Sequence, residues 1–158
     1  MTKKRWFPYL IGIVSAEAVG GLSALLSRNA MSAFGQSVQQ PPLSPPKILF
    51  PIVWSILYAL MGFSVTRIWL SPPSAQRSKG LNLYVAQLIV NFFWSLIFFN
   101  AQAFGFAFLW LLLLFVLVVL MILSFRKTDK LAAWLQIPYL LWLLFAAYLN
   151  FGVWYLNR

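Results

Sequence analysis

The sequence contains no cysteine and no histidine, and its only acidic residues are Glu17 and Asp129. Without these side chains there is no thiolate nucleophile, no imidazole base and no Cys/His metal site. Two isolated carboxylates also cannot supply the paired acids that glycoside hydrolysis and two-metal catalysis require. These absences exclude most enzyme classes, and we expect neither a bound metal nor a cofactor. With no cysteine, the redox compartment is also undefined.

Apolar residues are what the chain has in abundance. They account for 62% of its 158 residues, whereas charged residues account for 9%. The formal net charge of +10 would suit nucleic acid, but the Lys and Arg residues form short clusters between apolar runs. That distribution is typical of a membrane protein, in which positive charge sets the orientation. We therefore expect the lipid bilayer as partner and no nucleic acid.

Five apolar runs are long enough to cross a bilayer, since about 20 helical residues span about 30 Å of hydrocarbon. The weakest break between them is the turn near Gln102 to Gly105, where few residues are polar or flexible. We predict an all-α fold, an integral membrane bundle of five transmembrane helices in a single domain of residues 1–158. The predicted spans cover about 6–27, 47–70, 81–101, 104–125 and 131–155.

The cations are unevenly divided between the two sides of such a bundle. The N-terminal side carries Lys3, Lys4, Arg5, Arg67, Arg77, Lys79, Arg126, Lys127 and Lys130, and the other side carries Arg28, Lys47 and Arg158. Because cytoplasmic loops are enriched in Lys and Arg, we expect the N-terminus in the cytoplasm and the C-terminus outside, in a bacterial cell membrane. A cleavable signal peptide is the alternative for the first run, but its apolar residues continue to Leu26.

The first predicted span carries small residues at four-residue spacing and one acid. Small side chains at this interval let helix backbones approach closely in lipid, which indicates a packing stripe. Glu17 lies near the middle of the span, where an unpaired charge is costly. It is either a functional site or a neutral acid hydrogen-bonded to a neighbouring helix. The stripe consists of Gly12, Ala16, Gly20 and Ala24.

Polar and aromatic residues share one face in three other spans. The second span presents Trp54, Tyr58 and Gly62, the third Gln87, Asn91, Trp94 and Phe98, and the fifth Pro138, Trp142, Ala146 and Leu149, with Phe145 and Asn150 close beside. The two amides must meet another helix or line a cavity, because neither group can face lipid without a partner. Tryptophans on three helices favour the cavity, and they indicate a large, planar, mostly apolar ligand.

The second span is preceded by PPLSPP, which contains Pro41, Pro42, Leu43, Pro45 and Pro46. Proline fixes φ and cannot continue a helix, so this segment is expected to form a stiff, extended lid over the candidate cavity. A stiff lid loses little conformational entropy when it closes on a ligand.

Three blocks, PPLSPPKILFPIVWSILYALMG, GLNLYVAQLIVNFFWSLIFFN and IPYLLWLLFAAYLNFGVWYLN, resemble the TspO/MBR family of tryptophan-rich sensory proteins and translocator proteins. The resemblance runs over most of the chain. It implies a five-helix bundle, often a homodimer, that binds porphyrins and other tetrapyrroles, sterols and synthetic ligands of the benzodiazepine receptor class.

The resemblance also implies a pocket among the first, second, third and fifth helices, under the first loop. Its lining in this chain would be Trp54, Tyr58, Gln87, Asn91, Trp94, Trp142, Phe145, Ala146 and Leu149. The lid departs from the family pattern, since Phe34, Gly35, Gln40 and Leu43 replace residues that are commonly aromatic or basic. Val153, Tyr155 and Arg158 satisfy a weak sterol-recognition pattern, which an interfacial anchor also explains.

The leading hypothesis is a membrane receptor or carrier for tetrapyrroles and other hydrophobic ligands, with a regulatory role. The resemblance extends to slow light-dependent porphyrin degradation that would use Trp54 and Trp142, although we do not expect an enzyme in the ordinary sense. The alternative is a proton-coupled small multidrug exporter that uses Glu17. A scaffold that only regulates partner proteins is a third reading. The natural ligand, the direction of transport and the dimer interface are open at this point.

Overall fold

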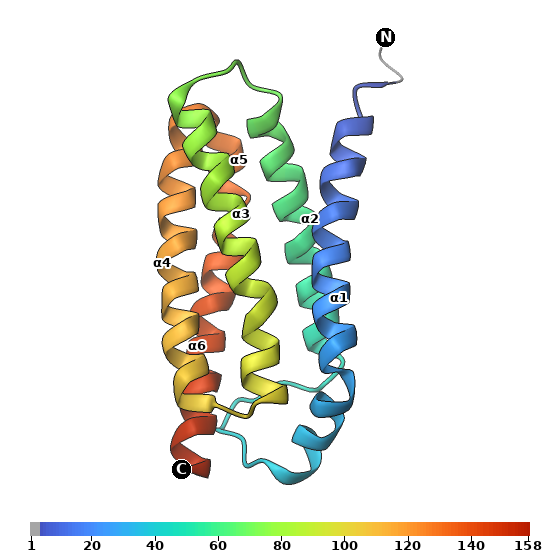
Figure 1. The fold of residues 1–158 in the computed structure, drawn as a ribbon, viewed down its shortest axis with the longest axis vertical. Helices are drawn as coiled ribbons and strands as arrows, with labels where there is room; N and C mark the ends of the chain where they lie inside the picture. The colour runs from blue at the N-terminus through green and yellow to red at the C-terminus, as the bar shows by residue number, and fades with distance from the viewer. Residues whose placement is uncertain (1–3) are drawn as a thin grey trace.

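The computed structural model describes residues 4–158, so the predicted cation Lys3 lies outside the described residues. The described chain is all-helical, and five of its helices are long and apolar enough to cross a membrane (Figure 1). The elements are α1 (Phe7–Ser37), α2 (Leu49–Trp69), α3 (Ala75–Ser95), the π-helix η2 (Leu96–Asn100), α4 (Phe104–Thr128), the short α5 (Lys130–Trp134) and α6 (Ile137–Asn157). These helices confirm the predicted fold class.

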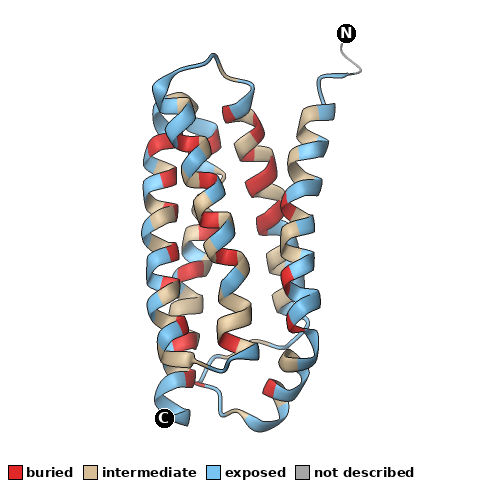
Figure 2. Cartoon of the chain, in the orientation of Figure 1, coloured by how far each residue is buried: buried red, intermediate tan, exposed pale blue. Residues whose placement is uncertain are grey.

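The long helices run side by side, and the start of α1 and the end of α6 lie at opposite ends of the bundle (Figure 1). Helix α1 packs against α2, and α4 packs against both α3 and α6. The buried positions lie mainly on the inner faces of the helices (Figure 2) and include Met61, Met121 and Leu143, each fully buried. Large apolar side chains such as Leu109 are exposed on the outside, as expected for helices whose solvent is lipid.

Helices α1 and α2 approach each other through glycine. A Cβ on Gly12 would meet the carbonyl oxygen of Gly62, and a Cβ on Gly20 would fall on the ring of Tyr58. Ala16, between the two glycines of α1, is fully buried. The predicted packing stripe is therefore confirmed at these three positions, whereas its fourth member, Ala24, is exposed.

The first helix is longer than the predicted span, since α1 continues ten residues past position 27 to Ser37. Residues 28–37 contain no proline, so nothing stops the helix after Arg28. The extension also has a packing partner, because Phe34 is buried and its ring lies 5.3 Å from that of Phe98. The connection to α2 is therefore only residues 38–48, here called the proline segment.

The third and fifth spans also differ from the prediction at their ends. Helix α3 starts at Ala75, six residues early, because Ser74 caps it by accepting a hydrogen bond from the Arg77 backbone N–H at 3.0 Å. The last span is divided into α5 and α6, and Pro138 lies in the first turn of α6. The turn expected near Gln102 to Gly105 lies at residues 101–103, between η2 and α4, and Gln102 adopts a positive φ of 51° there.

Candidate functional site

Four buried side chains form a continuous hydrogen-bonded chain across α2, α3 and α6. Tyr58 donates to Asn91 Oδ1 at 3.0 Å, and Asn91 Nδ2 donates to the hydroxyl of Tyr139 at 2.6 Å. The Tyr139 hydroxyl in turn donates to Gln87 Oε1 at 2.7 Å. We call these residues the tyrosine–amide chain. All its hydrogen bonds point in one direction, from Tyr58 towards Gln87.

The position of the chain follows from local sequence. Gln87 and Asn91 lie one helical turn apart on α3, and therefore on the same face. Gly20 of α1 leaves room for the ring of Tyr58, which lies opposite. Gln87 is fully buried and Tyr139 is 1% exposed, so the chain lies in the interior of the bundle. The amides thus bond to side chains of other helices, the first of the two alternatives that the sequence left open.

One donor at the end of this chain has only a weak acceptor. Gln87 Nε2 lies 4.0 Å from the sulfur of Met61, a long contact to a poor acceptor. The other polar atoms of the chain are engaged by oxygen or nitrogen partners. The Gln87 amide N–H is therefore the least satisfied donor of the tyrosine–amide chain.

Trp94 and Phe98 belong to a separate aromatic cluster near the turn between α3 and α4. Their rings stack with centroids 4.9 Å apart, and Trp94 Nε1 donates to Asn150 Oδ1 at 3.0 Å. Asn150 Nδ2 in turn donates to the backbone oxygen of Phe104 at 2.9 Å. Trp94 is thus held by its own partners, one turn beyond Asn91 on α3.

An open groove of about 580 Å³ lies between α2 and α6. Its lining is apolar and aromatic: Val53, Ile56, Leu57, Pro138, Leu141, Trp142 and Phe145. The ring centroids of Trp142 and Phe145 are 5.4 Å apart, and Phe50 lies 5.9 Å from Trp142. We call this feature the aromatic groove. It is open to the outside of the bundle and not an enclosed cavity.

Trp54 packs between the aromatic groove and the tyrosine–amide chain. Its ring lies 5.6 Å from Tyr58 and 6.2 Å from Tyr139, while its sequence neighbour Val53 lines the groove. Ala146 and Leu149, the remaining predicted lining residues, are half-buried on α6. The predicted site is therefore divided into the tyrosine–amide chain, the aromatic groove and the Trp94–Phe98 cluster.

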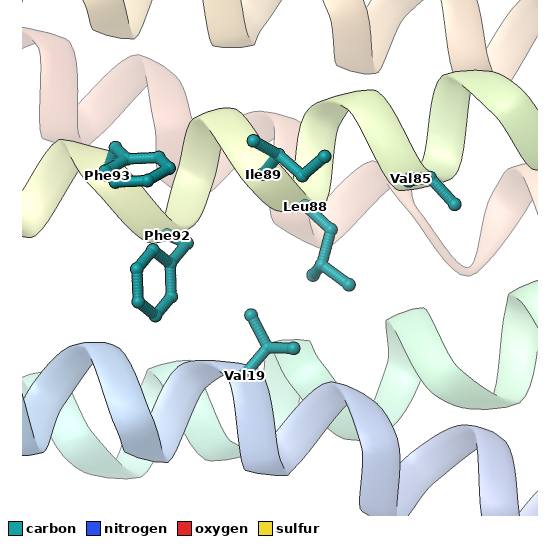
Figure 3. A pocket seen from close by; sticks show the side chains of 6 residues that line it. All are labelled: Val19, Val85, Leu88, Ile89, Phe92 and Phe93. Atoms are coloured by element: carbon teal, nitrogen blue, oxygen red, sulfur yellow. The ribbon is translucent and has the colours of Figure 1, made fainter.

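A second groove, of about 280 Å³, lies between α1 and α3 (Figure 3). Phe92 and Leu88 of α3 point towards Val19 of α1 across it. The complete lining, Val19, Val85, Leu88, Ile89, Phe92 and Phe93, is apolar and includes no predicted site residue. The aromatic groove is the better candidate, because it is larger and its lining includes the predicted residues Trp142 and Phe145.

The proline segment is docked onto the C-terminal half of α6. Pro41 is buried against Gly152, where a Cβ would collide with the proline ring. The Tyr148 hydroxyl donates to the Pro42 carbonyl at 2.7 Å, and the rings of Tyr148 and Phe145 lie 6.3 Å apart. The segment therefore connects to the aromatic groove through α6.

The Asn157 side chain adds a two-way link to this segment. The backbone N–H of Gln39 donates to Asn157 Oδ1 at 3.0 Å, and Asn157 Nδ2 donates to the Gln39 carbonyl at 2.8 Å. The segment expected to be extended is interrupted at one point, since Leu43 has a φ of 70° and the chain turns there. Ser44 stabilises this turn by donating to the Pro41 carbonyl at 2.7 Å. Pro45 and Pro46 follow the turn and lead towards α2.

Tyr139 was missed by the sequence analysis, and Asn150 was noted only as a neighbour of the predicted face. The buried face of α6 contains Tyr139, Leu143, Asn150 and Val153, which is one residue out of step with the predicted face. The sequence contained a signal for this face, because Tyr139 and Asn150 are eleven residues apart and therefore share a helical face after three turns. The predicted face borders the aromatic groove, where Trp142 is only half-buried.

The structure also places the residues of the sterol-recognition pattern and Glu17. Val153 is 3% exposed, whereas Tyr155 and Arg158 are exposed and the Arg158 guanidinium lies 4.3 Å from the Tyr155 ring centroid. The residues of the sterol pattern therefore do not form one continuous lipid-facing surface. Glu17 is half-buried on α1, and within residues 4–158 it makes no side-chain hydrogen bond or ion pair.

Comparison with known proteins identifies the family. The profile of the TspO/MBR family matches residues 11–156. The translocator protein of Ovis aries is 35% identical over 97% of this chain and 92% of its own length. The tryptophan-rich protein TspO of Chlorobaculum tepidum is 33% identical over 89% of each chain, and protein CrtK of Rhodobacter capsulatus is 33% identical over 94% of this chain and 92% of its own. With its five apolar helices, the chain is an integral membrane protein that belongs to the TspO/MBR family.

Proposed function

We propose that this protein is a membrane receptor or carrier that binds tetrapyrroles and similar flat hydrophobic ligands in the aromatic groove. Membership of the TspO/MBR family supports a receptor or transporter role in the membrane. The groove between α2 and α6 is the observation that supports a planar apolar ligand, because Trp142, Phe145 and Pro138 offer flat apolar surfaces there. Offset stacking on such rings favours a planar conjugated ligand over a flexible chain.

Polar groups near the groove would orient the ligand. The Gln87 amide nitrogen, whose acceptor is the Met61 sulfur, would change partner when a ligand with oxygen atoms inserts between α2 and α6. Trp54 separates this amide region from the groove, so its ring would move or stack on the ligand. Lys47 of the proline segment and Arg28 of α1 would pair with carboxylates at the ligand edge.

Light-dependent degradation of bound porphyrin is a part of this proposal that rests on Trp54 and Trp142. Both rings lie close to the groove or its inner wall. Degradation of the porphyrin is a net oxidation of its macrocycle, for which molecular oxygen would be the oxidant, and excitation of a porphyrin held against the two indoles would initiate it. Loss of porphyrin absorbance under illumination, measured for Trp142→Phe and the natural protein at a porphyrin concentration that saturates both, tests this step separately from binding.

The central experiment is a fluorescence titration of the detergent-purified protein with protoporphyrin, corrected for inner-filter absorption. We expect saturable quenching of tryptophan emission, and at least a fivefold weaker affinity for Trp142→Phe and for Gln87→Leu. The matched control is Trp134→Phe, because Trp134 is 70% exposed and does not line the groove. Linear quenching that is equal in all four proteins would mean that porphyrin only dissolves in the micelle.

A second candidate function rests on Glu17, the unpaired carboxylate of α1. An intramembrane acid without a partner is the usual proton carrier of a coupled exporter. In vesicles with an imposed pH gradient, Glu17→Gln would abolish drug uptake but leave porphyrin binding intact if the protein were such an exporter. Equal uptake by the two proteins would remove this alternative.

A further inference from the structure

The end of the bundle that holds the N-terminus carries a localised group of cations where α3 begins and α4 ends. The two helices are in contact there, since Ser124 Oγ donates to the Gln76 carbonyl at 3.4 Å and Gly80 packs on the ring of Phe125. The flanking cations are therefore gathered at one corner of the bundle. Lys79, Arg126, Lys127 and Lys130 form this basic corner, and all four are exposed.

The charge of the basic corner is not neutralised by the nearby protein groups in residues 4–158. Asp129, the acid at this end, accepts from Arg67 Nε at 2.7 Å and from the Leu131 backbone N–H at 3.0 Å. Glu17 lies within α1, away from this end. Four exposed cations beside one engaged carboxylate produce a positive potential that attracts an anion.

An apolar surface continues directly from the basic corner along α4. Val116, Leu120 and Leu123 precede Lys127 by eleven, seven and four residues, so all four positions share one helical face. The three apolar side chains are 52%, 44% and 51% exposed. Lys127 therefore lies at the head of an exposed apolar track that is long enough to contact much of an acyl chain.

Aromatic residues mark the level of the lipid headgroups at this end. Trp69 and Trp134 are 60% and 70% exposed, and exposed tryptophans at helix ends prefer the membrane interface. Arg77 lies 4.8 Å from the Trp69 ring centroid and donates to the Trp69 carbonyl, which fixes its charge at the same level. The basic corner is thus at headgroup depth, with its apolar track extending into the hydrocarbon.

We propose that the basic corner binds an anionic glycerophospholipid, with the headgroup phosphate at Lys127 and Lys130 and an acyl chain along the Val116–Leu123 face. A cation cluster alone would accept any phosphate, but the track below Lys127 selects an anion that carries a hydrocarbon chain. The site is remote from the aromatic groove, and its occupation does not depend on the proposed ligand function.

Native mass spectrometry of the full chain in detergent tests the proposal, with phosphatidylglycerol and phosphatidylcholine of identical acyl chains as probes. We expect phosphatidylglycerol to bind about tenfold or more tightly than phosphatidylcholine, and Lys127→Gln/Lys130→Gln to remove most of this preference. The control is Lys4→Gln/Arg5→Gln, which removes the same charge at the same end but beside α1. Lys127→Arg/Lys130→Arg keeps both positive charges and should retain tight binding. This result would show that the two positions tolerate substitution.

Several results would overturn this site. If Lys127→Gln/Lys130→Gln and Lys4→Gln/Arg5→Gln lose affinity for phosphatidylglycerol equally, binding depends only on the overall charge of this end of the bundle. If phosphatidylcholine binds as tightly as phosphatidylglycerol, the cations do not select the headgroup. If millimolar inorganic phosphate displaces phosphatidylglycerol, the corner is a simple anion site and the apolar track contributes nothing.

Discussion

Gly12 and Gly62 bring the backbones of α1 and α2 into direct contact. A Cβ on either residue would fall on the other helix: on Gly62 it would meet the Gly12 carbonyl and Ile13 Cα, and on Gly12 the Gly62 carbonyl and Thr66. These neighbours are mainly backbone atoms, which cannot rotate out of the way. The spacing of the two helices is therefore fixed by the absence of side chains at this crossing.

Gly62→Ala is expected to lower the free energy of unfolding by about 2 kcal/mol, because the added methyl forces the helices apart. The measurement is thermal or SDS-induced unfolding in a mild detergent. Gly21→Ala is the matched control, since a Cβ there has no neighbour within 4 Å. Alanine favours a helix over glycine, so Gly21→Ala should be neutral or stabilising. Equal destabilisation by both variants would show that the close approach is not what matters.

Tyr139→Phe should destabilise the bundle, because it removes the hydroxyl that joins Asn91 to Gln87. One buried donor and one buried acceptor would lose their partner, and we expect a loss of about 1–3 kcal/mol in the free energy of unfolding. Tyr155→Phe is the control, because Tyr155 is exposed at the end of α6. A stable Tyr139→Phe variant would mean that the amides find other partners without rearrangement.

Asn157→Ala is expected to release the proline segment from α6. The most direct readout is hydrogen exchange at the Gln39 amide, which donates to Asn157 Oδ1. We predict exchange at least tenfold faster, with little effect on overall stability, since exposed hydrogen bonds contribute only about 1 kcal/mol. Asn82→Ala, a change at an exposed position on α3, should leave this amide unaffected. Unchanged protection in Asn157→Ala would show that Pro41 and Tyr148 hold the segment by themselves.

Two substitutions at Asp129 separate its two roles. Asp129→Asn removes the ion pair with Arg67 but keeps an oxygen that can cap α5, and it should lower the unfolding free energy by about 0.5–1 kcal/mol. Asp129→Ala also removes the cap, which adds about 1 kcal/mol. The loss in Asp129→Asn should shrink in high salt, because the pair is partly exposed to solvent. A salt-independent loss would contradict an ionic origin.

The features that follow from local patterns were predictable from the sequence. Apolar runs of membrane-spanning length identify the five long helices, and four-residue spacing identifies the glycines that face α2. Gln87 and Asn91 were selected because amides within a span must find partners, and Tyr58 because it shares a face with Trp54 and Gly62. In the structure, Tyr58, Gln87 and Asn91 belong to one hydrogen-bonded chain. Periodicity alone is sufficient for each of these results.

The remaining features depend on contacts between distant parts of the chain. The end of α1 at Ser37 is supported by Phe34 packing on Phe98, which no local signal reveals. The buried face of α6 is set by Tyr139 and Asn150, which bond to partners on α3. Because α6 is apolar on all sides, its hydrophobic pattern alone does not distinguish this face from the one that is shifted by one residue. The turn at Leu43 likewise depends on Ser44 and on docking to α6.

The link between Gln39 and Asn157 joins residues 118 positions apart, so it spans most of the chain. During synthesis the proline segment leaves the ribosome long before its docking surface on α6 exists. It can be ordered only after the last helix has been made and inserted, because Tyr148, Gly152 and Asn157 all belong to that helix. Closing of the first loop is therefore a late event in biogenesis, and a chain truncated before α6 would expose this segment to proteases.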